Sequence, residues 1–202
     1  MTAAPARSAV FLDKDGTLLD DVPFNVDPAR MRLAPGAAEA LSILGALDNT
    51  PLIVVSNQAG IAHGRFSEAA MQTVAHALEE LFAAHGARLT AYYYCPHHPE
   101  GTDRRYARVC ECRKPLPGML ERAAAEHGVD LRYAWMVGDI LDDVEAGRRA
   151  GCTTVLVHNG NETEWQLTPL RRPHYSVTRL DHAARLISAW QRSGAAVEER
   201  AG

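Results

Sequence analysis

The sequence predicts an α/β fold, a three-layer sandwich in which a parallel sheet lies between two layers of helices. Apolar runs of strand length alternate with longer segments of helical spacing, as in sheets built from strand–helix–strand units. Runs such as LIVV and TVLV are apolar throughout, which is typical of parallel strands covered on both faces. The expected strands are Ala9–Leu12, Leu52–Val55, Leu89–Tyr94, Ala134–Val137 and Thr154–Val157.

Helices are expected between these strands, and their ends carry sequence signals. Ser67 is a suitable N-cap, and Pro117 suits a first helical turn. Gly128 and Gly151 suit the ends of two helices. Asp142 is expected only to favour the dipole at a helix N-terminus. The expected helices are Ala37–Leu47, Ser67–His85, Pro117–His127 and Asp142–Ala150.

Length and composition indicate an ordinary globular protein. Of the 202 residues, 47% are hydrophobic and 23% are charged, so we expect one domain over residues 1–190 and a flexible tail over 191–202. The net charge of −4 does not support a nucleic-acid or membrane partner. No signal peptide or bilayer-length apolar run is readable, so a cytoplasmic location is expected. A monomer is favoured.

Polar side chains follow several of the expected strands. In a parallel sheet the carboxyl ends of the strands meet at one edge, which is where ligands of such sheets bind. We therefore expect these side chains to converge there, together with a basic pair that precedes the third helix. The residues are Asp13, Asp15, Ser56, Asn57, Gln58, Arg113, Lys114, Asp139 and Asp143.

The chemistry of this set points to phosphoryl transfer. Carboxylates from Asp13, Asp15 and Asp139 suit Mg²⁺, which would also relieve their mutual repulsion. A hydroxyl and an ammonium group suit the phosphoryl oxygens, and an aspartate can serve as the nucleophile. The alternatives are that Asp13 and Asp15 only form a turn and that Ser56 only caps a strand. Lys14 is expected to point away from the site.

A second set of residues has the composition of a zinc site. Cys95 and His97 are followed after a polar loop by Cys110 and Cys112, which gives three thiolates and one imidazole for a tetrahedral Zn²⁺. Four protein ligands would make this zinc structural, within a loop that spans residues 95–112. Two alternatives remain open: the cysteines are unrelated buried residues, or His98 replaces His97 as the ligand.

The order of these motifs resembles a known family. D-x-D-G-T, S-N-Q, R-K-P and G-D-x-x-x-D, in this order, resemble the haloacid dehalogenase (HAD) superfamily of phosphatases. The added pattern C-P-H-H-P…C-x-C-R-K-P resembles its zinc-containing branch, the heptose bisphosphate phosphatases. This resemblance implies a Rossmann-like sheet. Because no helix-rich insertion separates the motifs, no large cap domain is expected.

The resemblance also implies roles for individual residues. Asp13 would be the nucleophile, and Asp15 the general acid and base, which also offers its backbone carbonyl to Mg²⁺. Ser56 and Lys114 would hold the transferring phosphoryl group. Asp139 would bind Mg²⁺ through its carboxylate.

Further roles concern the surroundings of the phosphoryl group. Asp143 would orient the Lys114 ammonium or a metal-bound water. Arg113 would recognise the phosphate that stays on the sugar, and Asp21 would contact the substrate. Asn57 and Gln58 would contact substrate or shape the loop. One departure from the family pattern is Ile140, which stands where a polar residue is usual.

The expected activity is Mg²⁺-dependent removal of the C7 phosphate from D-glycero-D-manno-heptose 1,7-bisphosphate, with a small phosphorylated sugar as partner and Zn²⁺ as a structural metal. A histidinol-phosphate phosphatase is the alternative enzyme, because that branch carries the same aspartates and a similar zinc loop. A catalytically silent phosphosugar-binding module is the non-enzymatic alternative.

Overall fold

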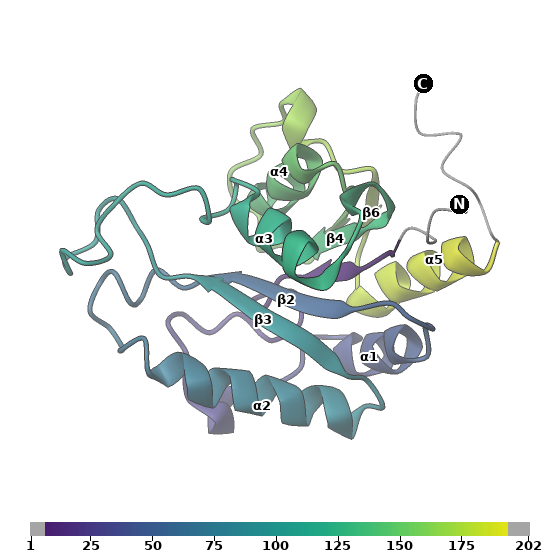
Figure 1. Cartoon of the computed structure of the whole chain (residues 1–202), viewed down its shortest axis with the longest axis horizontal. Coiled ribbons are helices and arrows are strands. Elements are labelled where there is room, and N and C mark those ends of the chain that lie inside the picture. Colours follow the sequence, from purple (N-terminus) through teal and green to yellow (C-terminus); the bar gives the residue numbers. More distant parts are fainter. Residues whose placement is uncertain (1–6, 194–202) are drawn as a thin grey trace.

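Within residues 7–193, which the computed structural model describes, six parallel strands form one sheet in the order β3-β2-β1-β4-β5-β6 (Figure 1). The strands are β1 (Val10–Leu12), β2 (Leu52–Asn57), β3 (Leu89–Cys95), β4 (Trp135–Gly138), β5 (Thr153–Val157) and β6 (Tyr175–Val177). The predicted parallel α/β fold is confirmed, and each expected strand is present. β6 was not predicted, because it is a short edge strand whose residues are largely exposed.

The helices pack against both faces of the sheet. They are α1 (Ala37–Gly45), α2 (Ala70–Ala84), α3 (Gly118–His127), α4 (Leu141–Ala150) and α5 (Leu180–Arg192), with short 3-10 turns η1 (Pro28–Arg30), η2 (Leu131–Tyr133) and η3 (Pro169–Arg171). α1, α2 and α5 cover one face, and α3 and α4 cover the other (Figure 1). The three-layer arrangement is therefore confirmed.

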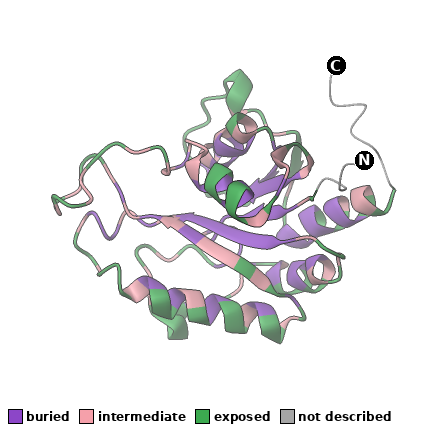
Figure 2. Ribbon diagram, viewed as in Figure 1, coloured by how far each residue is buried: buried purple, intermediate pink, exposed green. Residues whose placement is uncertain are grey.

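β1 illustrates how the sequence pattern produces these layers. Val10 and Leu12 join the core cluster under α1, α2 and α5, whereas Phe11 joins the cluster under α3. All three side chains are fully buried, and the strands stay buried throughout the centre of the sheet (Figure 2). Burial on both faces explains why the strand sequences are apolar without alternation.

Several helix ends differ from the sequence-based expectation by one to three residues, and one helix was not predicted. α2 begins at Ala70, three residues after the predicted N-cap, because the Ser67 carbonyl accepts a bond from the Ala70 amide in a preceding turn. α5 was not predicted, although Leu180, Ala183 and Ile187 form a buried apolar face on it. α5 includes residues 191 and 192 of the expected tail, and residues 194–202 of that tail lie outside the described residues.

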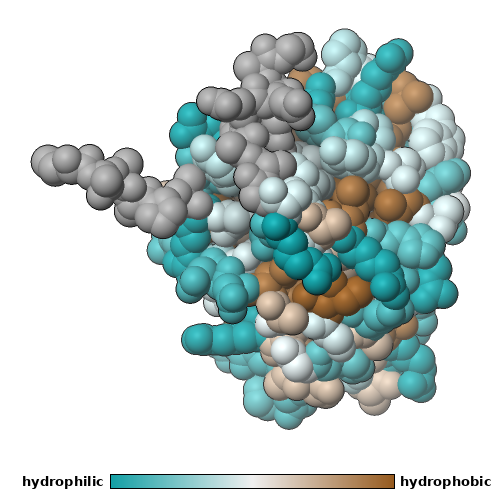
Figure 3. All heavy atoms as spheres, turned by 90° about the vertical axis from the view of Figure 1, so that its right-hand side faces the viewer, coloured by the Kyte–Doolittle hydropathy of each residue, from teal (hydrophilic) through white to brown (hydrophobic). Residues whose placement is uncertain are grey.

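The carboxyl ends of β1, β2 and β4 lie at one edge of the sheet, on the side of the loop between β3 and α3 (left in Figure 1). Figure 3 shows the opposite end of the molecule, where hydrophilic residues surround small apolar areas. None of the described helices is long and apolar enough to cross a membrane.

The burial of α5 yields a stability prediction. Ile187→Ala should lower the free energy of unfolding by about 2–4 kcal/mol, because it removes a fully buried side chain between α5 and the sheet. Denaturant unfolding measures this loss. The matched control is the exposed Arg192→Ala on the same helix, for which a change within about 0.5 kcal/mol is expected. Equal effects would show that α5 does not pack as described.

Candidate active site and zinc cluster

The ammonium group of Lys114 lies at the centre of the site and is almost fully buried. Its Nζ donates to Asp13 Oδ1 at 2.5 Å and to the Val55 carbonyl at 3.0 Å. It also lies 2.6 Å from Asp143 Oδ1. Burial lowers the pKa of Lys114, but the Asp13 and Asp143 carboxylates outweigh this and hold it above its usual value. The group therefore stays charged.

Three buried carboxylates cluster at this point, and two of them contact the Lys114 ammonium. One oxygen each from Asp13, Asp139 and Asp143 lie within 4.8 Å of one another. Burial raises the pKa of Asp13 well above its usual range, against the opposing effect of Lys114. Burial, together with the charge of Asp143, raises the pKa of Asp139 to about 6. The cluster carries more negative charge than Lys114 can balance, so it suits a hard divalent cation.

The Asp15 carboxylate is not part of the cluster formed by Asp13, Asp139 and Asp143. It is partly exposed, contacts the Lys14 ammonium and accepts a hydrogen bond from Gln58 Nε2 at 3.1 Å. The prediction that Lys14 points away from the site was wrong: β1 ends at Leu12, so the alternation of side chains does not continue to Lys14. Lys14 is buried, and its charge supports the Asp15 carboxylate.

The residues at the end of β2 and directly after it shape the floor of the site. Gln58 Nε2 also donates to Ser56 Oγ at 2.8 Å, which links the hydroxyl to Asp15. Asn57 makes two bonds to the backbone of Lys114, with Nδ2 donating to its carbonyl and Oδ1 accepting from its amide, both at 3.0 Å. Of the two roles expected for Asn57, the structure shows the contact that shapes the loop.

The loop after β5 contributes two asparagines, Asn159 and Asn161, to the site, and the sequence analysis did not predict this. Thr17 Oγ1 and Asn161 Nδ2 each donate to one oxygen of Asp139, at 2.9 and 2.8 Å. Asn159 Nδ2 donates to the Gly16 carbonyl at 2.6 Å. The signal was the N-G-N sequence after an apolar strand, which places amides at the same sheet edge as the aspartates.

An open cavity of about 470 Å³ adjoins Lys114. Its lining residues include Arg108, Arg113, Lys114, His98, Glu100 and Asp142. Arg113 makes one long bond, 3.4 Å, to the His97 carbonyl. Asp21 is exposed on the loop after β1, and within residues 7–193 it has no hydrogen bond or ion pair with these groups. The structure therefore brings Arg113 to the site and leaves Asp21 unattached.

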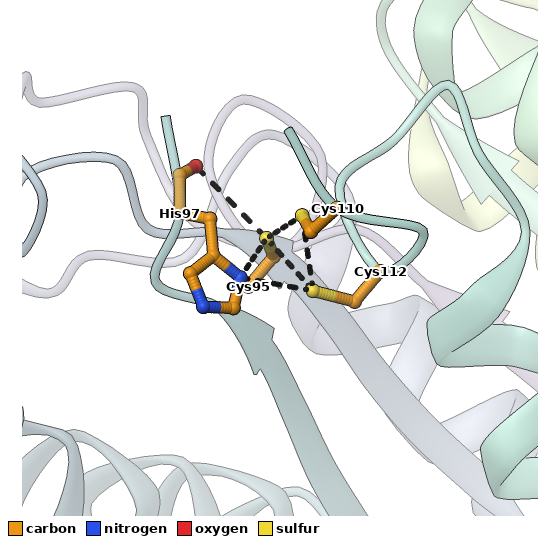
Figure 4. Close-up of side chains that lie close together, drawn as sticks. All are labelled: Cys95, His97, Cys110 and Cys112. Atoms are coloured by element: carbon orange, nitrogen blue, oxygen red, sulfur yellow. Dashed lines mark hydrogen bonds between the residues drawn. The ribbon is translucent and has the colours of Figure 1, made fainter. Parts of the chain in front are cut away.

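Three sulfurs and one imidazole converge at the end of β3 and in the loop that follows it (Figure 4). Cys112 Sγ lies 3.1 Å from Cys95 Sγ and 3.3 Å from Cys110 Sγ. His97 Nδ1 lies 3.4 Å from Cys112 Sγ. These separations are too long for disulfide bonds and suit ligands around a tetrahedral Zn²⁺ with bonds of about 2.0–2.3 Å.

The electrostatics of Cys112 also fit a zinc ligand. Its hydrogen-bond interactions with Cys95, His97 and Cys110 lower the pKa of Cys112 to about 5, so this thiol readily becomes a thiolate. His98 is not part of the cluster, because its ring packs on His63 with centroids 4.8 Å apart. Cys112 directly precedes Arg113 and Lys114 in the sequence, so the loop fixes where these cations point.

Comparisons with known proteins agree with this geometry. Residues 111–183 match the HAD-hydrolase-like family. The D-glycero-beta-D-manno-heptose-1,7-bisphosphate 7-phosphatase of Salmonella typhi is 37% identical over 176 residues, which cover 83% of this chain and 93% of the relative. That of Pasteurella multocida is 41% identical over 155 residues, which cover 76% and 83%. The chain belongs to the heptose-1,7-bisphosphate 7-phosphatase family.

A solved structure of a family member supports the metal assignment. The D,D-heptose 1,7-bisphosphate phosphatase from B. bronchiseptica, complexed with magnesium and phosphate, superposes with a TM-score of 0.76 at 30% identity. The match covers 92% of this chain and 99% of that chain. Together with the excess of buried carboxylates, it supports Mg²⁺ at the site, and the cysteine–histidine cluster fits Zn²⁺.

Gly16 provides a test of the close packing between the turn after Asp15 and the Asp139 carboxylate. Its φ is +87°, and a Cβ there would lie 2.1 Å from Asp139 Oδ2. Gly16→Ala should therefore lower the unfolding free energy by more than about 1 kcal/mol and weaken Mg²⁺ binding measured by calorimetry. Gly128→Ala is the matched control, because Gly128 also has positive φ (+64°) but a Cβ there meets no atom within 4 Å. Equal effects of both variants on Mg²⁺ affinity would contradict this account.

Removal of zinc should lower stability and activity together. Cys110→Ser removes one of the four ligands, and because structural zinc contributes folding free energy, we expect a melting temperature lower by about 10 °C. Elemental analysis should show one zinc per chain in the parent protein and a clear loss in the variant. Cys152→Ala, outside the cluster, should retain the metal. A protein that loses its zinc at unchanged stability and activity would rule out the structural role.

Proposed function

We propose that this chain is a Mg²⁺-dependent phosphatase that removes the C7 phosphate of D-glycero-D-manno-heptose 1,7-bisphosphate. The observation that carries the proposal is the buried Lys114 between Asp13 and Asp143, at the edge of a cavity that also contains Arg113. Membership of the 7-phosphatase family supports the substrate. We further propose a single domain over residues 1–190, in the cytoplasm and monomeric, with no nucleic-acid or membrane partner.

In the first half of the reaction, an Asp13 carboxylate oxygen attacks the C7 phosphorus. Lys114 already occupies Asp13 Oδ1, whereas Oδ2 takes part in no hydrogen bond described within residues 7–193. Oδ2 is therefore the attacking atom. As the general acid, Asp15 gives a proton to the departing C7 oxygen, so the sugar leaves as an alcohol and Asp13 carries an acyl phosphate.

In the second half, the Asp15 carboxylate takes a proton from water as the water attacks the acyl phosphate. The products are inorganic phosphate and the regenerated Asp13 carboxylate. Lys114 and the Ser56 hydroxyl stabilise the charge on the transferring oxygens, and Lys14 and Gln58 hold Asp15 in place. Asp13, Asp139 and the Asp15 carbonyl would hold Mg²⁺, which would supply further charge neutralisation.

Substrate selection depends on the cavity beside Lys114. The Arg113 guanidinium lines it and suits the phosphate that stays at C1, because a guanidinium binds phosphate through paired donors. We also propose that Asp21, exposed on the loop after β1, contacts the sugar. Asn57 and Gln58 keep Lys114 and Ser56 aligned through the hydrogen bonds described above.

Asp13→Asn tests the nucleophile. An amide cannot form the acyl phosphate, so phosphate release from the bisphosphate should fall by at least about 10³-fold. Melting temperature serves as the control for folding. Persistent turnover would contradict the mechanism.

A comparison of phosphate release from two substrates tests which compound the enzyme prefers. The unmodified protein should favour heptose 1,7-bisphosphate over histidinol phosphate by at least about tenfold in kcat/KM, since only the former places a second phosphate on Arg113. Preference for histidinol phosphate would support the alternative enzyme. No turnover of either compound would support a binding module.

A further inference from the structure

A carboxylate lines the cavity that the proposed function assigns to an anionic group. Asp142, the second residue of α4, lies in the same wall as Arg113 and Lys114. It is half-buried, so water screens its charge less than at the surface. A free carboxylate at this position would repel a phosphate and attract the nearest guanidinium.

The segment after β5 supplies the counter-charge. Arg171, at the end of η3, donates from Nη2 to Asp142 Oδ1 at 2.8 Å. Its Nε lies 3.8 Å from Glu145 Oε2, one helical turn further along α4. The Arg171 side chain is only 16% exposed, so this ion pair is held in a partly dry position between η3 and α4.

Arg113 competes for the same carboxylate. The charges of both Arg171 and Arg113 act on Asp142. Only Arg171 forms an ion pair with it, and among residues 7–193 Arg113 forms no salt bridge at all. Glu100 also lines the cavity and could attract the Arg113 guanidinium. It does so more weakly than Asp142, because Glu100 is exposed and solvent and salt screen its charge.

We propose that Arg171 is a positioning residue that determines specificity: by holding Asp142, it keeps the Arg113 guanidinium available for the phosphate that remains on the product. This inference rests on the proposed function, because it assumes a second anionic group in the cavity. Without Arg171, Asp142 would pair with Arg113, and both the attraction and the geometry for that group would be lost.

The test compares two substrates that differ only in the remote phosphate. Heptose 1,7-bisphosphate carries it and heptose 7-phosphate lacks it. Arg171→Met should raise KM for the bisphosphate about tenfold, a typical effect of one charge in a partly buried site. The kcat, and the KM for the 7-phosphate, should change by less than about twofold.

Two further variants separate electrostatics from packing. Arg171→Met/Asp142→Asn removes the unpaired carboxylate and should restore the KM for the bisphosphate, although η3 still lacks its arginine. Arg149→Met removes another arginine that pairs with Glu145 on α4, at 2.6 Å, and should leave both substrates unaffected. A failure of the double variant to restore KM, or equal losses for both substrates, would overturn the proposal.

A crystal structure of Arg171→Met gives a readout that does not depend on the substrate. The Arg113 guanidinium should lie within ion-pair distance of Asp142 in this variant, and should turn back in the double variant. If the unmodified enzyme shows no preference for the bisphosphate, the proposed substrate is wrong, and the position of Arg113 alone decides the inference. An Arg113 that stays in place in Arg171→Met overturns it.

Discussion

The Lys114 ammonium, buried between the Asp13 and Asp143 carboxylates, is the interaction on which the rest of the site depends. Removing a charge from water costs several kcal/mol, and the loss of one partner from a buried pair typically costs about 3–5 kcal/mol. The fold therefore has to bring three separate segments together: the end of β1, the start of α4 and the loop before α3. Asn57 fixes the backbone of that loop through two hydrogen bonds.

The carboxylates around Lys114 also explain why the site suits Mg²⁺, whereas zinc fits the separate cysteine–histidine cluster. One ammonium contacts two of three clustered buried carboxylates, and a hard divalent cation would neutralise the remaining negative charge. Zinc affects the position of Lys114 indirectly, because the last residue of the zinc cluster, Cys112, lies two residues before Lys114. A folded zinc loop thus determines where the Arg113 and Lys114 side chains enter the site.

The sequence predicted what depends on local pattern. Apolar strands identified the sheet, and the polar residues that follow Leu12 and Val55 identified its functional edge. The contacts that complete the site were not predictable, because they join loops without periodicity. Asn161 to Asp139 and Arg171 to Asp142 connect residues 22 and 29 positions apart, through a segment whose one local signal, N-G-N, does not show which side chains it contacts. Lys14 was misjudged because the strand ends earlier than its alternation suggested.

The central claim is that Asp13 becomes phosphorylated during turnover. The most direct measurement is acid quenching of the Mg²⁺-loaded enzyme with heptose 1,7-bisphosphate that carries ³²P at C7, followed by proteolysis and peptide mapping. The account predicts transient, alkali-labile label on the peptide that contains Asp13, at a level that rises and decays with turnover. Full turnover without label on that peptide, or label on another residue, would contradict it.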